Sequence, residues 1–400
     1  MRANEEQYAD SGIKFLRIQN ITPTGFDFSD VKYITEAVHN TLLKRSQLTE
    51  NDLLMTITGR IGTSTVVTTS CLPANINQHI VRIKLKKDID PNFAATYLNS
   101  NIGLLFSNRS VTGTTRLALD YESIKEIPFP VLPPEKQIAL RCQESTSIRQ
   151  YIEKLRQADK LLSQLSDILL SMLSIKSVDY ESRICCATTL SSIIDDKTFS
   201  ADYYHPERMA AIHMLKSNMD ITAYQLSDIV DFHRDLVNVT DNDDYLGLAS
   251  VESQTGELSG IHEKASGQAF IYKKGDVLYG RLRPYLNKVL FAEKSGVCST
   301  EFHVMRVINC EKVLPEYVAA ILRSDLILSQ TRHMMTGNTH PRISNDDVKN
   351  LYIPVPELAV QIEIVTELHN RRVQARRLKE EAELNWKAGK EQFEKELLGE

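Results

Sequence analysis

Apolar side chains recur every three or four residues along two long stretches of the chain, residues 134–175 and 357–400. Both stretches are poor in glycine and proline, which would interrupt a helix. This spacing is typical of a helix that packs an apolar seam against a partner helix in a coiled coil. A helix of roughly 40 residues is on the order of 60 Å long, more than the width of a compact domain. The predicted seam positions are Leu155, Ala158, Leu162, Leu165, Leu169 and Met172 in the first stretch and Leu368, Ala375, Leu378, Ala382, Trp386 and Phe393 in the second.

An extended segment is predicted in front of each long helix. Residues 127–134 read IPFPVLPP, and residues 351–356 read LYIPVP. Proline fixes its own φ and lacks a backbone donor, so both segments should be extended. Pro134 suits the first turn of the helix that it begins. The repeated arrangement indicates that the chain contains a duplication.

A comparison of the chain with itself supports this duplication. When residues 52–138 are compared with residues 276–362, at a shift of 224 positions and without gaps, 17 positions are identical. Ordinary residue usage would give roughly five identities by chance. A period this long is not that of a solenoid repeat. We therefore predict two similar domains, each followed by its own long helix.

The repeat divides the chain into five segments. We predict a first domain at 1–133, a central helix at 134–175, a connector with a short helix at 176–223, a second domain at 224–356 and a C-terminal helix at 357–400. Short apolar runs predict strands, and the pattern after residue 90 predicts a helix, so the fold class is α+β. A short strand expected at 224–230 has no counterpart in the first domain. We expect the opening strand of the first domain to be missing.

Composition indicates an ordinary soluble protein, with 42% hydrophobic and 25% charged residues. The N-terminus does not resemble a signal peptide, and no stretch approaches 18 uninterrupted apolar residues. Six cysteines form no CxxC pair, which indicates reduced thiols and a cytoplasmic location. The net charge of −5 argues mildly against a nucleic-acid partner, although acidic helices can mask basic surfaces elsewhere.

Motifs for catalysis and metal binding are missing from the sequence. No GxxxxGKS/T loop, GxGxxG turn, HExxH helix or GxSxG elbow occurs. The one Pro-Pro pair precedes Glu135, whereas an adenine methyltransferase would need an aromatic residue there. His79 and His303 repeat but lack neighbours at ligand spacing, and Asp195-Asp196 lacks a companion acid. We predict that this chain has no catalytic residues, no metal site and no cofactor of its own.

Polar loops are the stronger functional signal. The loop at 112–116 recurs at 336–342, and the turn at 59–65 corresponds to the segment 279–288. Hydroxyl, amide and cationic side chains, with glycines that allow close backbone approach, suit contacts to phosphates and base edges. The alternative is that these are turn glycines and strand-stabilising threonines. The candidate DNA-binding residues are Arg60, Thr63, Ser64, Thr112, Gly113, Thr114, Thr115, Arg116, Arg281, Arg283, Lys288, Thr336, Gly337, Asn338, Thr339, His340 and Arg342.

Several of these segments, taken together and in order, resemble the DNA sequence-specificity subunit of type I restriction–modification systems. They are GDVLYGRLRPYLNKV (275–289), STEFHVMR (299–306), the TGTTR and TGNTHPRI loops, the IPFPVLPPEKQ and IPVPELAVQ segments, and ADYYHPE (201–207). The resemblance implies two target-recognition domains held apart by two antiparallel helices, each domain reading one half of a split DNA site. It also implies two partner adenine-N6 methyltransferase subunits, which would bind S-adenosylmethionine, and translocating endonuclease subunits.

Two other interpretations remain open from the residues alone. The chain could be the recognition subunit of a different methylation-based defence system. It could also be a two-armed protein–protein scaffold that does not bind DNA, which the acidic net charge favours and the cation-bearing loops disfavour. The predicted function is therefore recognition of a bipartite DNA target on behalf of partner enzymes, without catalysis by this chain.

Overall fold

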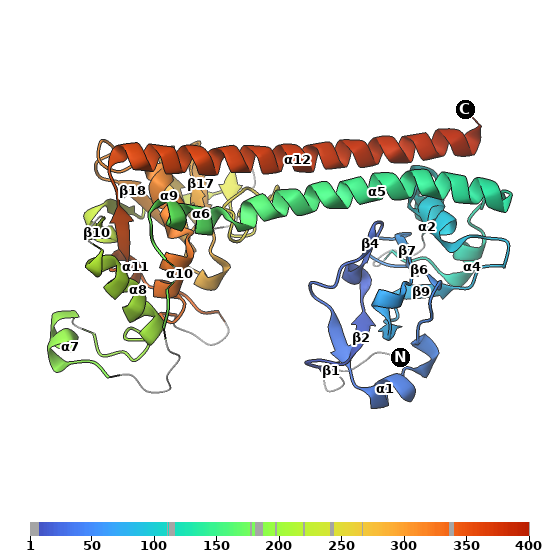
Figure 1. Cartoon of the computed structure of the whole chain (residues 1–400), viewed down its shortest axis with the longest axis horizontal. Helices are drawn as coiled ribbons and strands as arrows, with labels where there is room; N and C mark the ends of the chain where they lie inside the picture. Colours follow the sequence, from blue (N-terminus) through green and yellow to red (C-terminus); the bar gives the residue numbers. More distant parts are fainter. Residues whose placement is uncertain are drawn as a thin grey trace. The chain divides into compact units, whose positions relative to one another are not determined.

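The computed structural model describes residues 8–109, 111, 117–176, 178–180, 187–196, 198–218, 221–240, 244–265, 267–335 and 340–399 (Figure 1). The chain forms two compact units. Unit 1 comprises Met1–Arg156 and Leu378–Glu400, and unit 2 comprises Gln157–Arg377. Among the described residues, no helix has an apolar stretch that could cross a membrane.

Unit 1 is a mixed α/β domain with short strands. One sheet has the order β7 (Ser64–Val66), β6 (Leu53–Thr56), β9 (Ile80–Ile83), all antiparallel. A second sheet has the order β1 (Tyr8–Ala9), β5 (Lys32–Ile34), β2 (Ile13–Leu16), β8 (Ala74–Ile76), and β3 (Ile21–Thr22) pairs with β4 (Gly25–Phe26). Its short helices are α1 (Glu36–Asn40), α2 (Pro91–Asn99), α3 (Asn101–Arg109) and α4 (Tyr121–Lys125).

Helix α2 forms the centre of the unit 1 core. Asp90 caps its N-terminus by accepting a hydrogen bond from Phe93 N, and Pro91 occupies the first helical position, where no donor is needed. The helix buries Phe93 and Tyr97 against the β7–β6–β9 sheet. Phe393, from the C-terminal helix, completes this core, with its ring centroid 6.2 Å from that of Phe93.

Unit 2 contains the same three-stranded arrangement in a larger domain. Its main sheet has the order β11 (Val230–His233), β18 (Phe302–Val307), β15 (Val277–Gly280), β16 (Val289–Phe291). A second sheet has the order β12 (Leu236–Val239), β14 (Gly267–Tyr272), β17 (Gly296–Ser299), β13 (Tyr245–Leu246). The short helices are α7 (Leu190–Asp196), α8 (Pro206–Ser217), α9 (Pro315–Leu322), α10 (Asp325–Thr331) and α11 (Asn345–Lys349).

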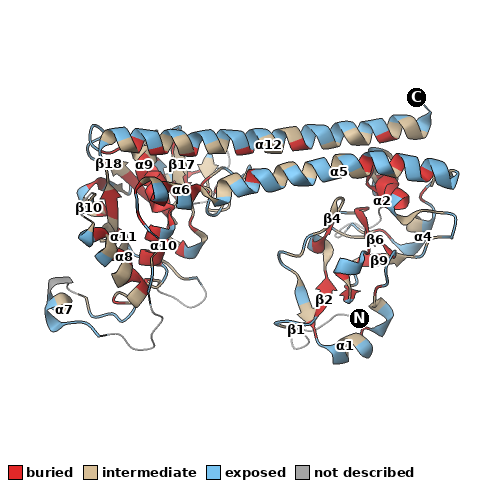
Figure 2. Cartoon of the chain, viewed as in Figure 1, coloured by how far each residue is buried: buried red, intermediate tan, exposed pale blue. Residues whose placement is uncertain are grey.

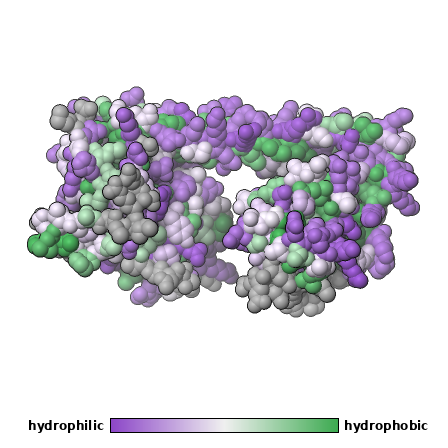
Figure 3. Space-filling view, turned by 60° about the horizontal axis from the view of Figure 1, so that its bottom comes forward, coloured by the Kyte–Doolittle hydropathy of each residue, from purple (hydrophilic) through white to green (hydrophobic). Residues whose placement is uncertain are grey.

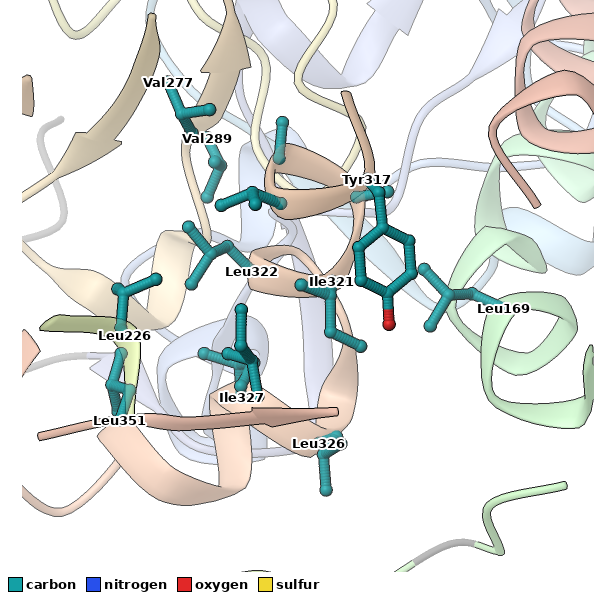
Figure 4. Close-up of a cluster of buried hydrophobic side chains, with 14 of the residues drawn as sticks. Leu169, Leu226, Val277, Val289, Tyr317, Ile321, Leu322, Leu326, Ile327 and Leu351 are labelled. Carbon is teal, nitrogen blue, oxygen red and sulfur yellow. The ribbon is translucent and has the colours of Figure 1, made fainter. Parts of the chain in front are cut away.

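The unit 2 core is centred on α9 and α10. Tyr317, Ile321 and Ile327 are fully buried there, and Leu169 from the preceding helical segment points toward Tyr317 (Figure 4). Each such side chain contributes about 1.5–3 kcal/mol when it leaves water. Burial of Leu169 therefore anchors the central helical segment to the second domain.

The central helical segment differs from its prediction. A single helix was predicted over 134–175, but the structure has α5 (Pro134–Ser163) and α6 (Leu165–Met172), with the chain bent at Gln164. The bend lets α6 bury Leu165, Leu169 and Leu170 in the unit 2 core. Core burial therefore outweighs continuation of a straight helix here. The predicted C-terminal helix is present as α12 (Leu358–Leu398).

Helices α5 and α12 lie side by side within unit 1. Tyr151 and Trp386 have ring centroids 4.9 Å apart, and Lys154 Nζ lies 2.7 Å from Glu381 Oε2, so the two helices run antiparallel. Bands of buried residues alternate with exposed ones along α12 in Figure 2, and the atoms visible along the upper edge of Figure 3 are mostly hydrophilic, with some hydrophobic patches. The predicted seam positions Leu165, Leu169 and Leu368 are buried, whereas Leu155, Leu162, Leu378 and Trp386 are half-buried.

A buried glutamine ties each long helix to its domain. In unit 2 the Gln361 Nε2 donates to Lys312 O (3.0 Å) and Pro356 O (2.8 Å), and its Oε1 accepts from Leu314 N (2.9 Å). Gln137 makes the three equivalent bonds in unit 1, at 2.7–2.9 Å. Both side chains are fully buried. An unpaired amide would be costly there, so the bonds fix how each helix leaves its domain.

A buried acid also recurs at the 224-residue offset. Asp276 in unit 2 is fully buried and makes two hydrogen bonds with Arg306, at 2.7 and 2.8 Å. Asp52 in unit 1 is 6% exposed, and Arg82 lies 3.7 Å from its carboxylate. Each acid immediately precedes a strand, β6 or β15, and each arginine lies in the neighbouring strand, β9 or β18, but the pair in unit 2 has the closer geometry.

The proline segments in front of the long helices differ between the units. In unit 2, β19 (Tyr352–Val355) pairs antiparallel with β10 (Thr222–Gln225). The corresponding residues of unit 1, 128–131, form no strand among those described, and Val131 is 75% exposed. The two-stranded sheet of β10 and β19 therefore has no counterpart among the described residues of unit 1.

We predict that Asp276→Asn lowers the free energy of unfolding by about 1.5–3 kcal/mol, because the charge-assisted bonds to Arg306 are lost at a buried site. Asp52→Asn is the matched control and should cost less, since its arginine lies farther away. Urea unfolding of the two variants measures this. An equal or larger loss in Asp52→Asn would contradict the prediction.

Candidate nucleic-acid interface

Two polar segments that are far apart in the sequence lie together in unit 2. Leu282 and Arg342 form an isolated antiparallel bridge. Arg283 N donates to Pro341 O at 2.7 Å, and Ile343 N donates to Arg281 O at 3.1 Å. These backbone bonds join the turn after β15 to the residues that follow the 336–339 loop. The sequence predicted both segments as binding loops but not their contact.

The turn after β15 holds a strained conformation. Arg283 has φ 50° and Asn287 has φ 52°, a left-handed region that side chains other than glycine adopt at a cost of about 1 kcal/mol or more. Asn287 is held in place by bonds from its Nδ2 to Gln254 Oε1 (3.0 Å) and Arg323 O (2.7 Å). The turn therefore presents Arg283 outward on a fixed backbone.

The side chains of this surface fall into two groups. Arg283 and His340 are exposed, and no hydrogen bond or ion pair to either side chain occurs among the described residues. Arg342, by contrast, makes hydrogen bonds of 2.7–3.1 Å with Glu301, which raises the pKa of its guanidinium. Lys288 donates from Nζ to Leu248 O at 2.7 Å, and burial lowers its pKa. Arg283 and His340 are therefore the residues available to a ligand.

His303 lies beneath this surface and is 3% exposed. Burial, and then the nearby Arg281, lower the pKa of His303 from 6.5 to about 3. The ring is neutral near pH 7 and packs against Phe232 and Tyr279. The Ile343 backbone and the Asn345 side chain act on the ring in the opposite direction, toward a higher pKa. His303 is thus a structural support under Arg281.

The corresponding surface of unit 1 corrects part of the sequence-based set. Thr58 and Ala118 form the matching bridge, and Arg60 is exposed. Thr63 and Ser64, however, are only 7% and 0% exposed, and the Ser64 hydroxyl donates to Gly62 O at 3.0 Å. We therefore remove Thr63 and Ser64 from the proposed contacts, because their side chains stabilise the fold. The predicted positions Thr112–Arg116 and Thr336–Thr339 lie outside the described residues.

One cluster of possible metal ligands was missed in the sequence. Ligand atoms of His205, Glu207 and His333 lie within 4.8 Å of one another. Glu207 is buried and accepts from Arg332 (2.6 Å) and from His333 (2.7 Å, if the facing ring nitrogen is protonated). The two imidazole rings stack, with centroids 3.4 Å apart and planes 16° apart. A histidine ligates a metal in its ring plane, so rings stacked in this way do not point at a shared ion. The arrangement suits neutralisation of a buried carboxylate.

We predict that His303 makes the free energy of unfolding depend on pH. Its folded-state pKa lies below its unfolded value, so its contribution is present above pH 6.5 and is lost as pH falls toward about 3. Between about pH 8 and pH 5 the wild-type chain should lose about 2 kcal/mol that His303→Gln does not lose. Urea unfolding at both pH values measures the difference, and His79→Gln is the matched control. Equal pH dependence in wild type and His303→Gln would contradict the prediction.

Comparison with known proteins identifies this region. Residues 220–381 match the family model described as the type I restriction modification DNA specificity domain. The EcoBI specificity subunit of Escherichia coli is 26% identical over 166 residues, which are 41% of this chain and 34% of that protein. The HindI specificity subunit of Haemophilus influenzae is 28% identical over 123 residues, 29% of this chain and 27% of that protein. The matches thus cover about a third or less of these relatives' length.

A solved structure described as "Structural basis underlying complex assembly and conformational transition of the type I R-M system" aligns with 98% of this chain and 94% of its own, with a TM-score of 0.49 and 13% identity. A likeness of that strength says nothing about what this chain binds. The family model and the curated relatives confirm the resemblance predicted from the sequence. Over residues 220–381, the chain is therefore similar to the DNA specificity domain of type I restriction–modification systems.

Proposed function

We propose that the chain is a non-catalytic DNA-recognition subunit that reads a bipartite target through two recognition domains. The observation that carries the proposal is the joined surface of unit 2, where backbone bonds hold residues 281–283 against 340–343. This surface presents an exposed arginine, Arg283, on a fixed turn and an exposed histidine, His340, beside it. Arginine can bond guanine edges in the major groove or phosphate oxygens, so the surface suits duplex DNA.

We propose that unit 1 is the second DNA-recognition domain. The 224-residue repeat places Arg60 near the corresponding bridge, Thr58 with Ala118. The buried glutamine and the buried acid recur at the same offset, which supports a common domain design. Different side chains on two similar domains would read two different half-sites, and we propose that the antiparallel helices form the coiled coil that sets their separation.

The partners of the complex follow from this proposal. We propose double-stranded DNA, two adenine-N6 methyltransferase subunits that bind S-adenosylmethionine, and translocating endonuclease subunits. A cytoplasmic location is part of the same proposal. The exposed polar residues along α12 and the exposed apolar residues Ile138 and Leu384 offer contact positions on the helices for such partners.

Substitutions at the two proposed DNA-reading surfaces test whether each domain recognises one half-site. Arg283→Gln should relax sequence preference in one half-site and Arg60→Gln in the other, because a lost base contact costs about 1–3 kcal/mol and acts locally. Arg371→Gln, an arginine paired with Glu367 on α12, is the matched control and should change neither half-site. Selection of bound duplexes from a random library measures the preferences.

The same binding experiment separates two kinds of contact. If either arginine meets a phosphate, its loss should weaken all sequences alike and reduce the salt slope of binding by about 0.9. Unchanged affinity and an unchanged selected motif in both Arg283→Gln and Arg60→Gln would contradict the proposed interface.

An insertion of one heptad tests whether the helices set the spacing. Seven residues lengthen a helix by about 10 Å, and a base pair rises about 3.4 Å, so the gap between half-sites should grow by roughly three base pairs. Both helices must be extended at facing positions, after Leu155 in α5 and after Leu378 in α12, because α5 ends at Ser163. The added pairs also rotate one half-site by nearly a third of a turn, so weaker binding is expected.

Sequencing of methylated adenines in cells that express the variant with its methyltransferase gives the readout. Unchanged half-sites with a longer gap support the helices as the spacer. Methylation at the original gap would show that something else positions the domains.

A further inference from the structure

A cavity of about 580 Å³ lies in unit 2 between α12 and the second sheet. None of its lining residues belongs to the proposed DNA-reading surface, which is formed by residues 281–283 and 340–343. The helix contributes His369, Arg372 and Arg376 to its wall, β14 contributes Tyr272, and the loop before β14 contributes Glu257. Leucine, valine and phenylalanine side chains supply apolar lining, and Arg323, Glu293 and Lys294 also line the cavity. The cavity therefore combines cationic and apolar walls, and its volume is that of a small-molecule site.

Arg323 lies in the floor of this cavity and is 8% exposed. Its Nη1 donates to Val289 O at 2.9 Å. A Cβ at Gly256 would lie 2.4 Å from Arg323 Nη1 and 2.3 Å from Val289 O, so only glycine permits this close approach. Burial, and then the neighbouring Arg372, lower the pKa of Arg323 well below its ordinary value. A buried guanidinium is costly unless a negative charge accompanies it.

Glu257 is a carboxylate that arginines of the cavity share. Its Oε2 accepts from Arg376 at 2.8 Å, its charge acts on Arg323, and its Oε1 lies 3.5 Å from Arg372 Nε. That Nε is buried and makes no hydrogen bond among the described residues. At the rim, Glu293 is exposed and Lys294 pairs with Asp244. Two largely buried guanidinium groups, those of Arg323 and Arg372, therefore share the Glu257 carboxylate.

The first domain shows that the fold does not need these charges. The residue equivalent to Arg323 is Asn99, whose Nδ2 donates to Ser64 O at 2.7 Å on the strand that corresponds to β16. A neutral amide thus supplies the same helix-to-strand link. The positions on α5 that correspond to Arg372 and Arg376 are Ile148 and Ile152. The cationic cluster is a feature of unit 2 alone among the described residues, which argues for a role beyond folding.

We propose that this cavity binds a small phosphate-bearing ligand of nucleotide size, with Arg323, Arg372 and Arg376 around the phosphate. Guanidinium groups match phosphate oxygens with paired hydrogen bonds. The cavity is much larger than a phosphate ion, and its apolar wall with Tyr272 suits the remainder of a nucleotide. Glu257 keeps the arginines in place when the ligand is absent. The proposal does not depend on the proposed DNA recognition.

Binding of nucleotides to the full chain tests this inference by titration calorimetry in phosphate-free buffer. ADP and AMP should bind, and adenosine and chloride at matched ionic strength should not. Arg372→Ile and Arg376→Ile, which introduce the residues of the first domain, should weaken nucleotide binding by about tenfold or more. Arg371→Ile is the matched control on the same helix and should leave binding unchanged.

Glu257→Gln provides a test that misfolding cannot imitate. It removes the internal carboxylate that competes with the phosphate, so nucleotide binding should become tighter. Inorganic phosphate and a short DNA duplex are added as competitors, and phosphate but not duplex should displace the nucleotide. Absence of nucleotide binding, binding that ignores Arg372→Ile and Arg376→Ile, weaker binding in Glu257→Gln, or displacement by duplex would each overturn the proposal.

Discussion

The attachment of each long helix to its domain depends on one buried glutamine. Gln361 and Gln137 each satisfy two backbone carbonyls and one backbone amide that no water reaches. Loss of such a side chain would leave three buried polar groups unpaired, which sets a strong energetic constraint. Because a helix is stiff, the angle fixed at its first turn is carried along its length. The proposed recognition of a split site would require that both attachments be rigid.

The reading surface of unit 2 relies on support of the same kind. Neutral His303 fills the space under Arg281, and the Arg342–Glu301 ion pair holds the neighbouring segment. In the proposed interface these residues would act without touching DNA, by supporting the segments that carry Arg283 and His340. The acidic net charge of the whole chain is compatible with the proposal, because binding depends on the local charge of a surface and not on the total charge of the chain.

Much of the architecture could be predicted from the sequence, because heptads and proline segments are local signals. The C-terminal helix, the helix after Asp90 and the repeated positions are examples. The bend at Gln164 could not be predicted, because it depends on the packing of Leu169 into the core of unit 2. The burial of Ser64 and the cationic cavity around Arg323 also escaped prediction. Both result from contacts between segments that are distant in sequence, and a polar residue type alone does not reveal them.

We propose that two similar domains of one chain read two separate pieces of DNA. A map of methylated adenines in cells that carry the wild-type chain with its adenine methyltransferase, compared with cells that lack the chain, tests this proposal. The map should contain one chain-dependent motif made of two defined half-sites, separated by a gap of constant length and unspecified sequence. A single uninterrupted motif, or methylation that does not depend on the chain, would contradict it.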